Sequence, residues 1–119
     1  MYDIDNKGIG EKTVVTMASA LTRGTDEGKP VKISASNTVA LAGDNELFHG
    51  IVKTIEKDGK CAVALDGVQT VTYSGTAPGL GLIKLEADGA GNVKVDATNG
   101  REHVVVAVDT TNTLVTFKL

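Results

Sequence analysis

A run of alternating apolar and polar residues from Cys61 to Val95 constrains the fold of this chain more than any other stretch. Four short alternations are separated by turn sequences at 66–67, 74–81 and 88–92, which are rich in Gly, Asp, Asn and Ser. A period of two places one set of side chains on a buried strand face and the other in solvent. The turn residues accept the positive φ angles and tight reversals that hairpins need. The stretch therefore predicts successive hairpins.

The same pattern continues on both sides of this run. Residues 13–22 favour a strand or extended arm over a helix, and Gly50 within the strand predicted at 47–56 indicates a bulge or a close backbone approach. The uninterrupted apolar run at 103–109 predicts a strand covered on both faces, and the alternation up to Leu119 predicts that the C-terminus is held in a sheet. Further strands are predicted with Val31 and Ile33, and with Val39 and Leu41, facing inward.

Nine or ten short strands without a convincing helix predict an all-β fold, a small single-domain β-barrel or β-sandwich. Alternation alone does not choose between barrel and sandwich, because both bury one face of each strand. The 119 residues fit one compact domain. We expect an extended N-terminal arm and loop at 1–28 and the β domain at 29–119. A faint echo between 58–67 and 88–100 is too short to indicate a repeat protein.

Charge and composition exclude several classes of function. A net charge of −3 argues against a nucleic-acid partner, which normally selects a basic surface. No apolar run approaches the roughly 20 residues that span a bilayer, and no signal peptide is apparent, so we expect synthesis in the cytoplasm and no membrane partner. The single cysteine, Cys61, has no partner for an internal disulfide and is expected to pack in the core.

Catalytic, metal and cofactor motifs are absent from the sequence. His49 and His103 are more than fifty positions apart, and no serine stands in a G-x-S-x-G turn. Asp88, Asn92 and Asp96 lack the spacing of a calcium loop, so an Asp-Gly hairpin explains them better. We therefore expect no enzyme, no cofactor and no bound metal.

Four segments together suggest a family: KPVKISASNTVAL, FHGIVKTI, the run from DGKCAVAL to GNVKV, and the terminal TLVTFKL after a valine-rich strand. In these glycine turns and apolar strands, residues 29–119 resemble the small β-rich capsid decoration, or cement, proteins of tailed bacteriophages and prophages. The resemblance implies a structural virion protein that binds the major capsid protein on the outer surface of the phage head, often as a homotrimer. Its localisation would then be the virion, after synthesis in the host cytoplasm.

The resemblance supplies no binding residue position by position. From the sequence itself we predict contact with a partner at Tyr2, Ile4 and Ile9, the apolar residues of the arm, and at Pro78 and Leu80 in the loop 74–81. Two alternatives remain: another virion module, such as part of a tail or fibre base, or a small ligand-binding β-barrel with a pocket at its mouth.

Overall fold

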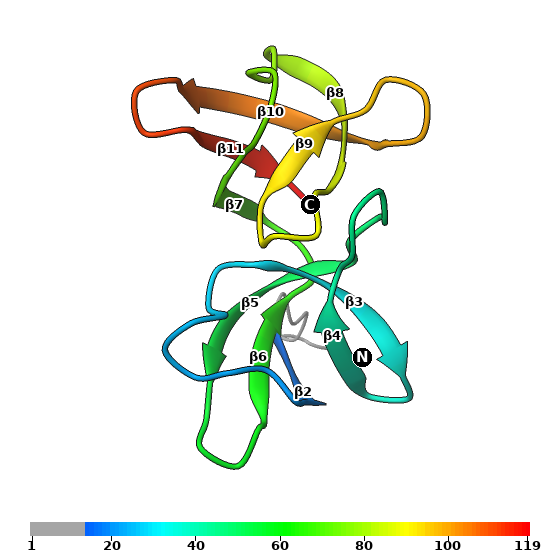
Figure 1. Ribbon diagram of the computed structural model, residues 1–119, viewed down its shortest axis with the longest axis vertical. Helices are drawn as coiled ribbons and strands as arrows, with labels where there is room; N and C mark the ends of the chain where they lie inside the picture. The colour runs from blue at the N-terminus through cyan, green and yellow to red at the C-terminus, as the bar shows by residue number, and fades with distance from the viewer. Residues whose placement is uncertain (1–13) are drawn as a thin grey trace, which may run out of the picture.

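The computed structural model describes residues 14–119, which form ten strands and contain no helix (Figure 1). The all-β prediction is confirmed. The strands are β2 (Val14–Ser19), β3 (Pro30–Ala35), β4 (Thr38–Leu41), β5 (Gly50–Ile55), β6 (Cys61–Ala64), β7 (Val68–Thr72), β8 (Gly81–Ala87), β9 (Val93–Val95), β10 (Arg101–Asp109) and β11 (Leu114–Lys118).

The first five described strands form a closed barrel in the order β2-β4-β3-β5-β6. Neighbouring strands are antiparallel, with one exception: β2 runs parallel to β4, where Ala18 and Ser19 lie opposite Thr38 and Val39. Closing the sheet in this way leaves few exposed strand edges.

The remaining strands form a five-stranded sheet in the order β7-β11-β10-β8-β9. A parallel bridge between Tyr73 and Val93 brings its two edge strands together at one end. The connectivity repeats that of the barrel strand for strand. In each half the first strand is antiparallel to the fifth and parallel to the third, and the second is antiparallel to the fourth. The chain thus builds one topology twice.

The echo expected between 58–67 and 88–100 does not mark this repetition. The first segment includes β6, the fifth strand of its half, whereas the second includes β9, the third strand of its half. The two segments share a turn followed by a short strand, which is local hairpin chemistry.

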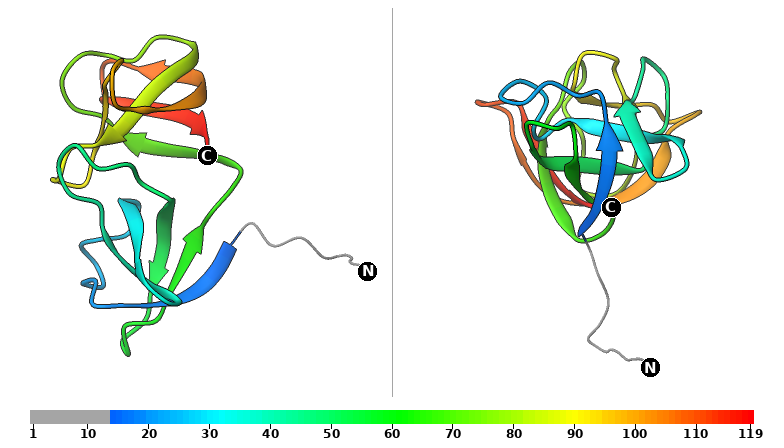
Figure 2. Two further views of the ribbon diagram at one scale, coloured as in Figure 1. Left: turned by 90° about the vertical axis from the view of Figure 1, so that its right-hand side faces the viewer. Right: turned by 90° about the horizontal axis from the view of Figure 1, so that it is seen from below.

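The two halves follow one another along the long axis and share part of their core (Figure 2). One cluster fills the barrel around Val31, Val52 and Val63. The other lies within the second sheet, yet it also takes in Ala42 and Phe48 from the first half.

Phe48 is 2% exposed and stacks on His103 of β10, with ring centroids 5.1 Å apart. Phe117 of β11 meets both rings edge-on. This aromatic cluster makes the two halves one packed unit.

The loop between β4 and β5 also joins the halves through backbone hydrogen bonds. The Asn45 amide donates to the Ala87 carbonyl, and the Ala87 amide donates to the Glu46 carbonyl. Gly89 permits the approach: its φ is +82°, and a Cβ there would lie 2.8 Å from the Asp44 nitrogen. The loop therefore continues the second sheet beyond the end of β8.

Two details of the sequence prediction are wrong. The strand at 103–109 is covered on one face only, because β10 alternates and leaves Val104 and Val106 exposed. Ile33, expected inward, is 42% exposed, and it lies beyond Pro30 and Val31, the two residues of β3 that pair with β5. In addition, β2 completes the first barrel, so a boundary after residue 28 would cut through a packed unit.

Other details are confirmed. A Cβ at Gly50 would lie 2.6 Å from the Ala64 carbonyl oxygen, which is the close approach expected there. Cys61 is buried, and the C-terminus is held where the Leu119 amide donates to the Gly67 carbonyl.

Candidate docking surface

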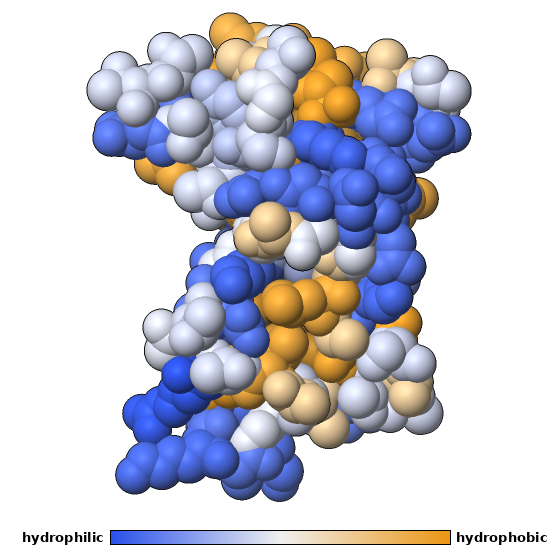
Figure 3. Space-filling model, in the orientation of Figure 1, coloured by the Kyte–Doolittle hydropathy of each residue, from blue (hydrophilic) through white to orange (hydrophobic). Residues whose placement is uncertain are grey.

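Five large apolar side chains are exposed on the second sheet and the loop that leads into β8. Leu82 of β8 lies opposite Val104 of β10, and both are exposed. Leu80 and Leu82 are the most exposed, at 69% and 66%. We call this surface the outer face, and its members are Val68, Leu80, Leu82, Val104 and Val106. Apolar side chains are visible near β8 at the top of Figure 3.

The backbone of β10 explains why valines lie on both sides of it. His103 and Val105 point into the core, so Val104 must point out. A β-bulge between Val105 and Ala107 then leaves Val106 outside the regular pairing with β11, and it is 53% exposed. Sequence reasoning missed both residues because an unbroken apolar run does not reveal which faces are covered.

The first barrel shows that this topology does not require an apolar exterior. Its fourth strand, β5, occupies the position that β10 has in the second half. There the exposed residues are Lys53 and Thr54. A patch of exposed leucine and valine beyond what the fold needs is typical of a surface that binds another macromolecule.

A buried carboxyl lies near the end of β8, on the same face of that strand as Leu82, because Leu85 and Ala87 on either side of it belong to the core. Glu86 of β8 has no exposed surface, and neither of its carboxyl oxygens has a hydrogen-bond partner. Burial, with the nearby charge of Asp96, raises the pKa of Glu86. The Lys94 Nζ lies 3.6 Å from the Glu86 Oε2 but is held more closely by Asp44 and Asn45, at 2.7 Å each. Lys94 of β9 therefore ties the β4–β5 loop to the second sheet.

The two histidines lie in unlike surroundings that do not form a catalytic pair. His103 is buried between Phe48 and Phe117, and its Nδ1 donates to the Lys118 carbonyl, 3.0 Å away. Burial lowers the pKa of His103, which keeps the ring neutral. His49 is exposed, and its Nδ1 accepts from the Ile33 amide. The buried Cys61 thiol donates to the Met17 carbonyl.

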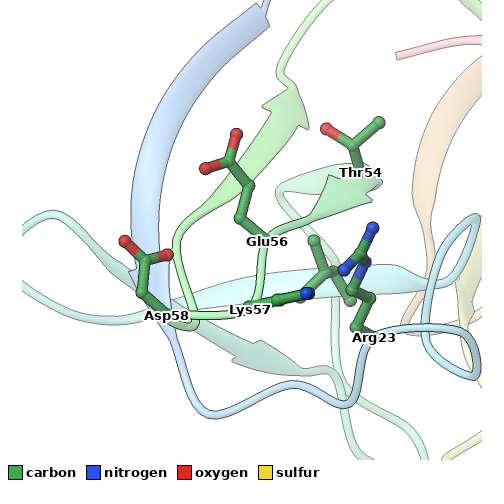
Figure 4. A pocket seen from close by; sticks show the side chains of 6 residues that line it. Arg23, Thr54, Glu56, Lys57 and Asp58 are labelled. Carbon is green, nitrogen blue, oxygen red and sulfur yellow. The ribbon is translucent and has the colours of Figure 1, made fainter.

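A wide depression of about 640 Å³ lies beside the β5–β6 hairpin (Figure 4). Arg23 and Lys57 reach toward one side of it, and Glu56 and Asp58 extend to the other in this view. All four side chains are exposed, and the interior of the barrel behind them is filled by core residues. The depression therefore lacks the enclosed apolar walls typical of a small-molecule site.

The residues predicted to contact a partner fall into three groups. Leu80 is exposed and belongs to the outer face. Pro78 is buried, so its ring packs inward instead of lying on the surface. Tyr2, Ile4 and Ile9 lie outside the described residues.

Within residues 14–119, no cluster of three or more His, Cys, Asp or Glu side chains could hold a metal ion. The same part of the chain contains no helix long and apolar enough to cross a membrane. Comparison of the sequence with known proteins found no family model and no curated protein that matches it.

Proposed function

We propose that this protein is a structural component of a phage virion that decorates the capsid, with the outer face of the second sheet as its docking surface. The observation that carries the proposal is the exposed row formed by Leu82 and Val104, for which the topology has no need. The resemblance of residues 29–119 to capsid decoration proteins supplies the partner, the major capsid protein, and the expected trimer.

Burial of the outer face against the capsid would supply the binding energy. A large apolar side chain contributes about 1.5–3 kcal/mol when it passes from full exposure to full burial. Several copies bound across neighbouring capsid subunits would raise the free energy needed to separate those subunits. The protein would thus stabilise the head without performing chemistry.

The test is co-sedimentation with undecorated capsids assembled from the major capsid protein encoded in the same genome. We expect the wild type to bind in stoichiometric amount and the double variant Leu82→Ser/Val104→Thr to bind at least tenfold more weakly. Ile33→Ser is the matched control, since Ile33 has the same 42% exposure as Val104 but lies on the first barrel.

Circular dichroism and thermal unfolding would establish that each variant remains folded. Equal binding by the wild type and the folded double variant would overturn the assignment of the outer face. No binding of the wild type to the capsids would overturn the proposed function itself.

A further inference from the structure

Lys94 of β9 lies between two sets of acceptors. Its Nζ donates to the Oδ1 atoms of Asp44 and Asn45 in the β4–β5 loop, at 2.7 Å each, and lies 3.6 Å from the Glu86 Oε2. Asp44 and Asn45 are exposed, whereas Glu86 has no exposed surface. The loop therefore holds the ammonium from the solvent side, and Glu86 faces it from the interior.

Glu86 lacks the contacts that a buried carboxylate requires. Neither of its oxygens has a hydrogen-bond partner, and a buried charge without a partner is strongly disfavoured. The nearby Asp96 accepts from the Thr98 and Asn99 amides through its Oδ1, which keeps it ionised. Asp88, two residues beyond Glu86, accepts four hydrogen bonds and is a second fixed anion. Both neighbours therefore favour a protonated Glu86.

Lys94 is the cation that can respond to an ionised Glu86. Lys84 lies on the same face of β8, opposite Glu102 of β10, and Arg101 of β10 lies on the other face. Among the described residues, only the Lys94 ammonium is within ion-pair distance of the Glu86 carboxyl. An ionised Glu86 would therefore accept a hydrogen bond from Lys94.

This hydrogen bond would draw Lys94 away from the loop. A charge-assisted N–H···O bond is about 2.8 Å long, so the ammonium would move inward by roughly 0.8 Å from its present 3.6 Å. Attraction to the buried Glu86 is screened less than attraction to Asp44, whose side chain is 61% exposed. We propose that Lys94 is a pH-sensitive latch between the two halves: it holds the β4–β5 loop while Glu86 is protonated, and it moves to Glu86 when that carboxyl releases its proton to solvent.

The latch acts on the loop that joins the halves. That loop also carries Phe48, and it is bonded to Ala87 through the Asn45 amide and the Glu46 carbonyl. When Lys94 leaves, the loop keeps these backbone bonds but loses two side-chain bonds to β9. Local opening of the loop should then become more frequent. The inference goes beyond the proposed function and does not depend on it.

Hydrogen exchange at the Asn45 and Ala87 amides tests the latch. Protection factors are used, because they remove the direct effect of pH on the chemistry of exchange. We expect both factors to fall about threefold in the wild type as Glu86 ionises, the change expected for loss of an exposed ion pair. In Glu86→Gln, whose side chain does not ionise, they should be independent of pH. The Ala18 amide, which donates to the Asn37 carbonyl in the first barrel, is the internal control.

The coupling must also operate in the reverse direction, because linkage between two equilibria is reciprocal. Asn45→Gly removes a neutral acceptor of Lys94, and glycine accepts the φ of +63° found there. It should free Lys94 for Glu86 and so lower the pKa of Glu86, followed by carbon-13 NMR of its carboxyl, by about half a pH unit. Asn37→Gly is the matched control, since Asn37 is also exposed with a positive φ but lies in the β3–β4 turn.

Three results would overturn the latch. The first is a Glu86 carboxyl that does not titrate in the folded wild type between about pH 3 and 9. The second is protection at Asn45 and Ala87 that stays level or rises as Glu86 ionises. The third is a Glu86 titration that is the same in Asn45→Gly and Asn37→Gly. If Glu86→Gln fails to fold, Lys94→Met takes its place: without the ammonium, protection of the loop should no longer depend on Glu86.

Discussion

Replacing Phe48 with alanine tests whether the two halves form one cooperative unit. Phe48 leaves the first half and inserts its ring, 2% exposed, between elements of the second, where it stacks on His103 and meets Phe117 edge-on. Loss of a buried phenylalanine costs about 3–5 kcal/mol. The lost aromatic contacts favour the upper part of that range.

For a chain of this size, each kcal/mol of lost stability lowers the melting temperature by about 4 °C, so the melting temperature of Phe48→Ala should fall by roughly 12–20 °C. The assay is urea unfolding followed by circular dichroism, with calorimetry as a second probe. Leu47→Ala is the matched control, because Leu47 precedes Phe48 but is 43% exposed, and its loss should cost well below 1 kcal/mol.

Two results would refute this reasoning. A loss of less than about 1 kcal/mol for Phe48→Ala would mean that the ring is not a structural joint. Two separate unfolding transitions in the wild type would mean that the halves fold independently and share no cooperative core.

Three further changes test the buried groups and one close approach. Burial raises the pKa of Glu86 above its value in the unfolded chain, so the stability that Glu86 contributes is present below about pH 4.5 and is lost as pH rises through the folded pKa. Glu86→Gln should remove this pH dependence from the free energy of unfolding, measured by urea titration between about pH 4 and 7. Burial lowers the pKa of His103, so the free energy of unfolding should fall as pH falls below about 6.5. In His103→Asn that part of the pH profile should be flat. An unchanged slope would contradict the assignment of this pH dependence to His103. Gly50→Ala should cost about 1–3 kcal/mol in the same assay, since the added Cβ would lie 2.6 Å from the Ala64 carbonyl oxygen. Gly79→Ala is the control and should change stability little, because its Cβ would meet only a side-chain methyl at 3.4 Å.

The outer face extends across the second sheet as far as β7. Val68 begins β7 and is 57% exposed, and through Lys118 it lies in one register row with Val104 and Leu82. The surface proposed to meet the capsid would therefore reach from β8 across β10 and β11 to β7.

The sequence by itself determined the local structure. Alternation with a period of two and Asp-Gly or Asn-rich turns decide where strands begin and end, since side-chain direction and φ preference are local properties. This is why the all-β fold, the buried Cys61, the close approach at Gly50 and the C-terminus held in a sheet were predictable. The exposed Leu80 also followed from its place in a polar loop.

Only the tertiary structure decided which strands became neighbours and which faces were covered. The repeated topology depends on pairings between distant residues, such as Tyr73 with Val93, that no local pattern encodes. The same holds for Val104, which a buried and an exposed strand face would both accept, and for His103, which became a core residue because Phe48 from the other half covers it. Burial is a property of what packs against a residue, and that is settled by the assembled chain.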